Sequence, residues 1–329
     1  MAIPVRSNLR AMSDNQTLLI GGGAPDLISQ VRSLYPSLQI LSGQQLKENP
    51  STLPTIDAAY GWLTKDQIAG AANLRWLQLA SAGVNGVITP EIKARDLIIT
   101  NAKGIHAEPI TEHMFGMLLM ITRRLGAAWD RQKLEKWNGE GLGDHVTLLA
   151  GKTLGILGVG AIGGQSARVG KAFDMHVVGL RRTGEPHEHI DQMYTLDQTH
   201  EFLAASDVIM NSLPKTEKTM GFLGPQEFEA MKPGAILINT GRGSTVKTDA
   251  MLAALASGKL SAALLDVTDP EPLPEGHPLW TTPNVFITPH YSGAHPEYDE
   301  RADKIFLENL RRYLAGETLM NVVDKEEGY

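Results

Sequence analysis

Three side chains in the C-terminal half of the chain could together act on a small keto acid. Arg242, Glu271 and His290 each follow a short apolar run of the kind that forms a buried strand. An arginine holds a carboxylate through a forked, charge-assisted pair, and a histidine moves a proton near neutral pH. A carboxylate beside the histidine orients its ring and favours the imidazolium form. This set suits hydride transfer to a 2-keto acid, in which a developing alkoxide must be protonated.

Each of these residues alone also has an ordinary structural explanation. Arg242 could be a surface charge, Glu271 lies in a proline-rich loop, and His290 is one of 10 histidines. The combination favours catalysis, because the C-terminal ends of the strands in a doubly wound sheet face the ligand crevice. All three residues follow predicted strands C-terminal to a glycine-rich motif.

That motif, Gly158-Val159-Gly160-Ala161-Ile162-Gly163, lies between an apolar strand and a helix, and another apolar strand follows. In this context Gly158 permits a tight turn, Gly160 lets the backbone approach a pyrophosphate, and Gly163 lets the helix pack close to the strand. The helix N-terminus adds free N–H groups and the positive end of its dipole. The motif therefore predicts dinucleotide binding, and a structural turn is the alternative.

The residues after the second strand bear on the choice of dinucleotide. NAD-binding units usually carry an acidic residue about 20 residues after the glycines, where it binds the adenosine ribose. Here Arg181 and Arg182 stand at that place, and no acid does. Because arginine pairs with phosphate and stacks on adenine, we expect NADP(H) to be the preferred cofactor and NAD(H) to be usable as well. The alternative is a solvated basic turn.

Strands alternate with helices along the chain, which predicts an α/β fold with parallel sheets. A long amphipathic helix is expected over 109–125 and a polar helix over 127–136. A C-terminal helix is expected over 302–314. The expected strands cover residues 17–20, 38–41, 58–61, 76–79, 98–100, 154–157, 176–180, 208–211, 235–239, 262–266 and 285–288.

The composition argues against several classes of protein. The 329 residues include 30 Lys+Arg and 37 Asp+Glu, a formal net charge of −7, so nothing predicts a nucleic-acid binder. No apolar run reaches the ~18 residues of a membrane span, and we expect a cytoplasmic protein. There is no cysteine, and His187 and His189 lack a nearby carboxylate cluster, so we expect no metal site. The 33 glycines make up about a tenth of the 329 residues, whereas glycine usually accounts for ~7% of a protein.

These motifs together resemble the D-isomer-specific 2-hydroxyacid dehydrogenase family. The similarity extends from about Leu18 to the C-terminus. It rests on the glycine motif, on three segments that contain the candidate residues, and on the C-terminal tail. The three segments are 239–243 (NTGRG), 266–273 (DVTDPEPL) and 288–290 (TPH). The similar parts of the tail are 308–316 (ENLRRYLAG) and 321–324 (NVVD).

The resemblance implies specific roles. Arg242 would bind the carboxylate and carbonyl of a 2-keto acid, His290 would exchange the proton, and Glu271 would pair with His290. Asp266 would bind the nicotinamide carboxamide, and the backbone N–H groups of a turn would hold the substrate carboxylate. The turn residues are Ala82 and Gly83, and the further cofactor-lining residues are Leu213, Pro214, Thr240, Gly241 and His290.

The family also implies two Rossmann-like doubly wound domains, a flavodoxin-like substrate domain and a Rossmann cofactor domain. We expect the substrate domain at 17–102 plus 292–329, the cofactor domain at 103–291, and a disordered tail at 1–16. A homodimer built on the cofactor domain is expected, with 109–137 contributing. The predicted activity is interconversion of small 2-keto acids and D-2-hydroxy acids, with no membrane or nucleic-acid partner. The alternatives are a reductase specific for glyoxylate or hydroxypyruvate, and a nucleotide-sensing regulator of the same fold.

Overall fold

The computed structural model describes residues 16–84, 86–137, 139 and 141–326, so the expected N-terminal tail lies, except for Gln16, outside the described residues. The chain divides into two compact units. Unit 1 comprises the described residues up to Ile105 and those from His295 onward, and unit 2 comprises His106–Ala294. The sequence placed the boundaries at 102/103 and 291/292.

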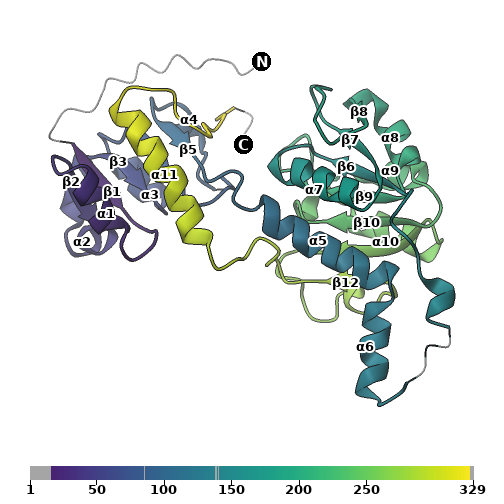
Figure 1. Ribbon diagram of the computed structural model, residues 1–329. Helices are drawn as coiled ribbons and strands as arrows, with labels where there is room; N and C mark the ends of the chain where they lie inside the picture. Colours follow the sequence, from purple (N-terminus) through teal and green to yellow (C-terminus); the bar gives the residue numbers. More distant parts are fainter. Residues whose placement is uncertain (1–15, 85, 138, 140, 327–329) are drawn as a thin grey trace. The chain divides into compact units, whose positions relative to one another are not determined.

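Unit 1 is a 5-stranded parallel sheet in the order β2-β1-β3-β4-β5, the flavodoxin-like order. Helices α1 and α11 pack on one face of the sheet, and α2, α3 and α4 pack on the other (Figure 1). The strands are β1 (Thr17–Ile20), β2 (Gln39–Ser42), β3 (Ile56–Tyr60), β4 (Trp76–Gln78) and β5 (Ile98–Thr100), and the helices are α1 (Leu27–Leu34), α2 (Gly43–Glu48), α3 (Lys65–Gly70), α4 (Pro90–Lys93) and α11 (Tyr298–Leu314).

Helix α11 is joined to unit 1 through buried polar contacts as well as apolar ones. The Asp303 carboxylate accepts hydrogen bonds from the Tyr60 hydroxyl at 2.7 Å and from the Ala24 amide at 2.8 Å. Asn309 donates to Gln78 at 2.8 Å. The Asp303 side chain lies among the buried residues of the unit, and this burial raises the pKa of its carboxyl. These bonds explain how a C-terminal helix completes a domain that begins at the N-terminal end of the chain.

Unit 2 is a 7-stranded parallel sheet in the order β12-β11-β10-β9-β6-β7-β8. Together the two sheets confirm the predicted fold class. The strands are β6 (Thr153–Leu157), β7 (His176–Leu180), β8 (Gln192–Tyr194), β9 (Val208–Asn211), β10 (Ala235–Asn239), β11 (Leu260–Leu265) and β12 (Val285–Ile287), and the helices are α5 (Ala107–Thr122), α6 (Leu125–Lys133), α7 (Ala161–Ala172), α8 (Thr199–Ala205), α9 (Pro225–Ala230) and α10 (Thr248–Ala256).

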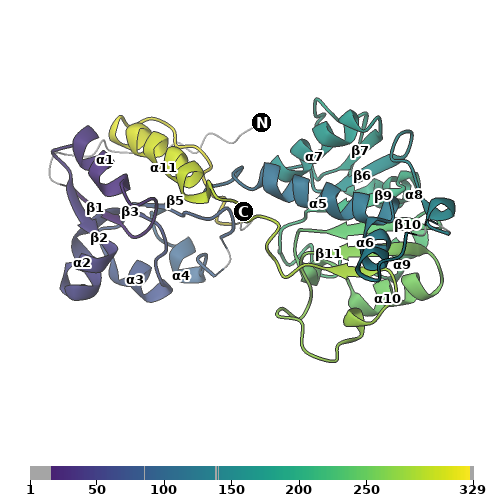
Figure 2. The ribbon, with the colours of Figure 1, turned by 60° about the horizontal axis from the view of Figure 1, so that its bottom comes forward.

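Side chains of the unit 2 strands alternate between two apolar cores. Ile209 packs with the helices α8, α9 and α10, whereas its neighbour Met210 packs with α5 and α7. Successive residues of a strand point to opposite faces, and a sheet covered on both faces needs apolar residues at every position. This explains why these strands appear in the sequence as continuous apolar runs. The helices on both faces of the unit 2 sheet are visible in Figure 2.

The helix boundaries differ from the expected ones for identifiable reasons. Helix α5 ends at Thr122, and Arg124 adopts a left-handed conformation with φ of 58° before α6 begins at Leu125. Helix α11 begins at Tyr298 rather than at 302, because its first turn carries Asp299 and Glu300, which the helix dipole favours there. Among the described residues, no helix combines the length and apolar character that crossing a bilayer requires.

Candidate active site

The candidate residues of unit 2 lie along one edge of its sheet. Asn239 at the end of β10 pairs with Leu265 of β11, and Leu265 pairs with Ile287 of β12. The residues that follow the three strands therefore emerge side by side, and the Thr288 amide donates to the Leu265 carbonyl at 2.9 Å. This alignment brings the loops that carry Arg242, Glu271 and His290 to one edge.

The glycine motif begins at the same edge, after β6. Gly158 has φ of +96°, and its amide donates to the carbonyl of Leu180 in β7 at 3.1 Å. A Cβ added at Gly163 would lie 2.4 Å from the Gly158 carbonyl oxygen, so only glycine fits there. At Gly160, the residue before α7, a Cβ would meet no atom within 4 Å.

These features fit a dinucleotide pyrophosphate. The turn presents the N-terminus of the 12-residue helix α7, and the space beside Gly160 is open. Helix N-termini bind phosphate through free N–H groups and the helix dipole. Ala161 and Ile162 supply the first two residues of this helix, as the motif predicted.

Arg181 directly follows β7, next to the glycine turn, but its guanidinium already has partners. It donates to the Thr183 hydroxyl at 3.0 Å and to the Glu185 carboxylate at 2.5 Å. The sequence analysis did not foresee this ion pair. A phosphate bound at this place would have to share or replace the Glu185 contact. Arg182 is exposed beside it.

The loop that contains Arg242 rests on buried amides. Asn211, at the end of β9, donates to the Asn239 side chain at 3.1 Å and to the Thr245 hydroxyl at 2.6 Å. Asn239 and Thr245 in turn donate to the Arg242 carbonyl at 3.3 and 2.7 Å. The side-chain oxygen of Asn211 also accepts from the Leu213 amide. Asn211 therefore supports both the Arg242 loop and the predicted cofactor loop at Leu213, a role the sequence analysis missed.

Two glycines bring the neighbouring loops into close contact. A Cβ at Gly241 would lie 2.7 Å from the Leu213 carbonyl oxygen, and one at Gly243 would lie 1.9 Å from that of Thr268. Pro214 and Thr240 lie in these same loops, and the Thr240 hydroxyl contacts the Met114 sulfur of α5 at 3.5 Å. The residues on either side of Arg242 thus have little freedom to move.

The Arg242 guanidinium remains available to an anion. It is partly buried, and Nη1 donates to the Gly241 carbonyl at 2.7 Å. Within the described part of the chain, no carboxylate forms an ion pair with it. Since a guanidinium has five N–H donors, most of its donors can serve a bound carboxylate.

His290 and Glu271 form the predicted pair. His290 Nδ1 contacts the Glu271 carboxylate, and the side chains are 47% and 39% exposed. The acidic partner on Nδ1 leaves Nε2 as the ring atom that can exchange a proton with a ligand. Both groups reach solvent, so a substrate can approach them.

The backbone at His290 is unusual. Its φ is 53°, an uncommon conformation for a non-glycine residue, which tends to occur at functional sites. Its amide donates to the carbonyls of Asp266 and Thr288, each at 2.9 Å. This tight turn directly follows β12 and leaves the imidazole 47% exposed.

Asp266 is almost completely buried, 2% exposed, and its carboxylate is occupied by the His290 loop. It accepts hydrogen bonds from the Thr288 hydroxyl at 2.7 Å and from the amides of Tyr291 and Ser292 at 3.2 and 3.1 Å. A carboxylate has about four lone-pair sites, so these three hydrogen bonds neither require nor prevent the predicted contact with a nicotinamide. What the structure adds is a role in holding the loop.

Ala82 and Gly83 belong to unit 1 and follow β4. Ser81 donates its hydroxyl to the Gly83 carbonyl at 2.8 Å, and Asn101 donates to the Ala82 carbonyl at 2.7 Å. These bonds occupy the carbonyls of the turn. Neither the Ala82 nor the Gly83 amide donates to another described residue, so both remain possible anion donors.

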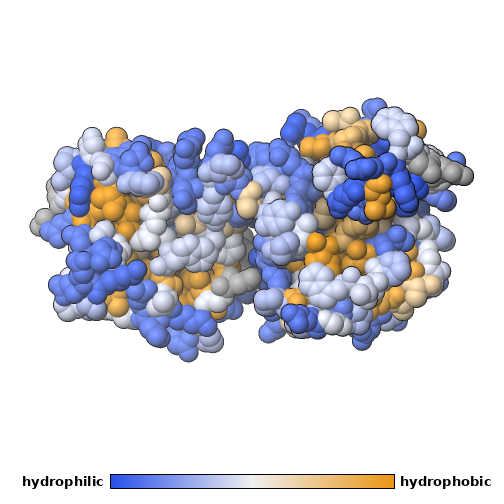
Figure 3. Space-filling model, turned by 90° about the horizontal axis from the view of Figure 1, so that it is seen from below, coloured by the Kyte–Doolittle hydropathy of each residue, from blue (hydrophilic) through white to orange (hydrophobic). Residues whose placement is uncertain are grey.

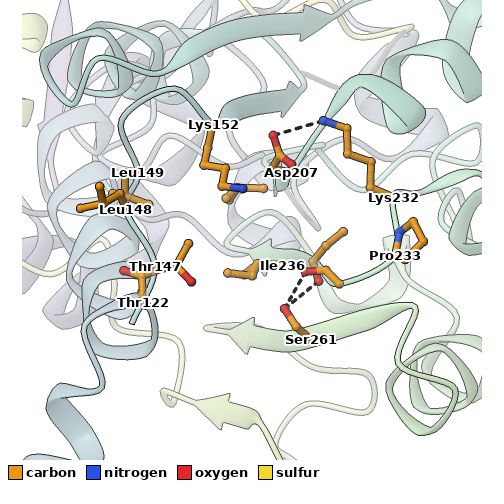
Figure 4. A pocket seen from close by; sticks show the side chains of 13 residues that line it. Thr122, Thr147, Leu148, Leu149, Lys152, Asp207, Lys232, Pro233, Ile236 and Ser261 are labelled. Atoms are coloured by element: carbon orange, nitrogen blue, oxygen red, sulfur yellow. Dashed lines mark hydrogen bonds and ion pairs between the residues drawn. The ribbon is translucent and has the colours of Figure 1, made fainter. Parts of the chain in front are cut away.

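A surface cavity of about 210 Å³ lies away from these residues, at the opposite edge of the unit 2 sheet. Figure 4 shows it among the first residues of β9, β10 and β11. There Lys232 pairs with Asp207 at 3.2 Å, and Asp207 also accepts from the Thr153 amide at 2.8 Å. The pair joins the beginnings of neighbouring strands. No group of three or more potential metal ligands occurs among the residues that the structure describes.

Comparison with known proteins identifies the family. Residues 115–292 match the family model described as D-isomer specific 2-hydroxyacid dehydrogenase, NAD binding domain. A glyoxylate reductase from Aeropyrum pernix is 33% identical over 279 residues, which are 82% of this chain and 83% of that protein. This chain belongs to the D-isomer-specific 2-hydroxyacid dehydrogenase family. It is accordingly an oxidoreductase with a dinucleotide-binding domain.

Solved structures agree with this assignment. A family protein from Aeromonas salmonicida has a TM-score of 0.81 and 34% identity, covering 94% of this chain and 99% of its own. An NADPH-dependent glyoxylate/hydroxypyruvate reductase from Sinorhizobium meliloti, in complex with NADP and sulfate, has a TM-score of 0.80 and 26% identity, covering 95% of this chain and 100% of its own. Both likenesses extend over both units of this dehydrogenase.

The second and third glycines of the motif should respond differently to alanine. Gly160→Ala should fold normally, because its Cβ meets nothing. It should weaken dinucleotide binding by about 10-fold or more, because the added Cβ keeps the pyrophosphate away from the backbone N–H groups and so weakens a charged hydrogen bond. Gly163→Ala should lower the stability of unit 2 by roughly 1–3 kcal/mol through overpacking. Calorimetric titration with NADPH and NADH and thermal unfolding test both. Unchanged affinity in Gly160→Ala would contradict the placement of the pyrophosphate.

Proposed function

We propose that this dehydrogenase reduces small 2-keto acids of the glyoxylate and hydroxypyruvate type to D-2-hydroxy acids, with NADPH as the preferred donor. The observation that carries the proposal is the shared sheet edge. It presents a guanidinium with donors to spare at Arg242 and a carboxylate-paired imidazole at His290. The substrates named for the relatives from Aeropyrum and Sinorhizobium support the choice of acid.

Arg242 binds the substrate carboxylate and carbonyl oxygen in this proposal. Holding both groups fixes the reacting carbon, and positioning of this kind supplies a large part of an enzyme's rate enhancement. The amides of Ala82 and Gly83 are proposed as further donors to the carboxylate. This role is supported because neither amide donates a hydrogen bond to an acceptor among the described residues.

His290 donates the proton to the carbonyl oxygen as it gains negative charge. Glu271 orients the ring through Nδ1 and favours the protonated imidazolium before transfer. A nicotinamide bound at this sheet edge would supply the hydride. In the reverse direction neutral His290 accepts the proton of the hydroxy acid, and Glu271 stabilises the charge that forms.

We infer a preference for NADPH from Arg181 and Arg182, which stand where NAD-binding units usually have an acid. The ion pair of Arg181 with Glu185 fixes the guanidinium close to the end of β7. A 2′-phosphate would take over part of that pairing, since phosphate is the more highly charged partner.

A cytoplasmic location is our expectation for a reductase that uses NADPH.

A homodimer is proposed from exposed apolar residues in and after α6. Large apolar side chains there are about half exposed or more. We infer that they form one surface patch, and exposed apolar patches mark protein interfaces. Figure 3 views the molecule from the side on which α6 projects in Figure 1 and shows apolar surface on unit 2. The patch residues are Leu125, Trp129, Leu134, Trp137 and Leu148.

Replacement of the proton donor tests the reaction. His290→Asn keeps a residue that tolerates positive φ but cannot supply the proton, so kcat for glyoxylate with NADPH should fall about 10²–10⁴-fold. The affinity for NADPH should stay near that of the wild type. His200→Asn, which changes an exposed histidine of α8, is the control. Near-normal turnover in His290→Asn would contradict the role of His290, and a wild type that reduces no 2-keto acid would favour the regulatory alternative.

The cofactor preference is tested at the end of β7. Arg181→Ala should lower kcat/KM for NADPH by about 10–100-fold, the value of a charge-assisted contact, and leave NADH nearly unaffected. Arg168→Ala, on the exposed side of α7, should change neither. Equal loss with both cofactors, or equal use of both by the wild type, would contradict the preference.

The dimer is tested by placing charge on the patch. The double variant Trp129→Glu/Leu134→Glu should sediment as a monomer at micromolar concentration, because burying unpaired carboxylates is costly. Leu34→Glu replaces a comparably exposed leucine of unit 1 and should remain dimeric. Analytical ultracentrifugation gives the answer, and a dimeric double variant would place the interface elsewhere.

A further inference from the structure

One histidine beside the candidate site has no part in the reaction as described above. His113 lies on α5, and its side chain is only 14% exposed. Its Nε2 lies 2.9 Å from the Thr288 hydroxyl, and its ring meets that of Tyr291 edge-on at 5.1 Å. Thr288 and Tyr291 stand on either side of the segment that contains His290.

The hydrogen-bond directions follow from counting protons. The Thr288 hydroxyl has one proton and lies 2.7 Å from the Asp266 carboxylate, which acts as acceptor and also receives the Tyr291 and Ser292 amides. The hydroxyl proton therefore goes to Asp266. His113 Nε2 must then carry a proton and donate it to the Thr288 oxygen.

The resulting series of hydrogen bonds extends from α5 to the loop that contains His290. His113 donates to Thr288, Thr288 donates to Asp266, and Asp266 accepts the two amides that follow His290. His113 Nε2 also lies 3.8 Å from the Asp266 carboxylate, so a charged ring would attract it directly. Removal of His113 leaves the Thr288 hydroxyl oxygen without a donor and removes the contact that joins the His290 loop to α5.

We propose that His113 is a positioning residue that holds the His290 loop in its productive geometry through Thr288 and Asp266. It does not touch the reacting atoms. The inference rests on the proposed function for its catalytic consequence, but the ordering of segment 288–292 is independent of any substrate.

The test compares a donor-free and a donor-keeping replacement. His113→Phe keeps the ring and removes the donor, so kcat for glyoxylate should fall about 10–100-fold, as expected for a misplaced catalytic group, while KM for NADPH stays unchanged. His113→Gln places an amide N–H close to the position of Nε2 and should retain most of kcat. Equal loss in both variants, or full activity in His113→Phe, would overturn the proposal.

Thr288→Val removes the other partner of the His113–Thr288 hydrogen bond. It therefore also serves as the test if His113→Phe does not fold. It should reproduce the loss in kcat, and full activity in this variant would overturn the proposal. Amide hydrogen exchange of the peptide 288–292 separates this inference from the proposed function. Exchange should be faster in His113→Phe and Thr288→Val than in the wild type and His113→Gln, even if no keto acid is reduced. Identical exchange in all four proteins would refute the positioning role.

Discussion

The register of three parallel strands is the constraint on which the candidate site depends. Because Asn239 pairs with Leu265 and Leu265 pairs with Ile287, β10, β11 and β12 end at the same level. A one-residue slip in any of these strands would turn every one of its side chains to the other face. The two apolar cores prevent that slip, since each strand has matched residues on both faces. The reactive groups themselves contribute little to this alignment.

Glycine and buried amides then set the geometry beyond the strand ends. Gly241 and Gly243 allow the Arg242 loop to lie against its neighbours at distances that a side chain would prevent. Asn211 supports the same loop from beneath, and Asp266 supports the loop of His290. Buried polar groups of this kind are costly unless every one is paired. Their pairing makes the surface above them rigid, which suits a site that works by positioning.

Much of this arrangement could be predicted from the sequence. The unit 2 strands are continuous apolar runs, and most were placed within one or two residues. Strand β8 was missed because Gln192–Tyr194 is short and not strongly apolar. The start of α11 was misplaced because its first turn is acidic and exposed. The glycine motif, Arg242, Glu271 and His290 stand in motifs whose spacing carries chemical meaning, so the sequence alone was enough to propose them as site residues.

The supporting residues could not be found in the same way. His113 is a single histidine at the margin of an apolar helix, and only its contact with Thr288, 175 residues away, gives it significance. Asn211 ends a strand as many polar residues do, and two of its three partners, Asn239 and Thr245, lie 28 and 34 residues further along the chain. The pairing of Arg181 with Glu185 depends on a turn conformation that residue types do not determine. Long-range hydrogen bonds leave no periodic pattern in a sequence.

The central claim is that Arg242 recognises a carboxylate beside the carbonyl that is reduced. The most direct measurement compares kcat/KM for glyoxylate and for its neutral amide, glyoxylamide, in the wild type and in Arg242→Ala. We expect the wild type to prefer the acid by about 100-fold or more, the worth of a bidentate charged pair, and Arg242→Ala to lose that preference. A preference that persists in Arg242→Ala, or a wild type indifferent to the carboxylate, would contradict this claim.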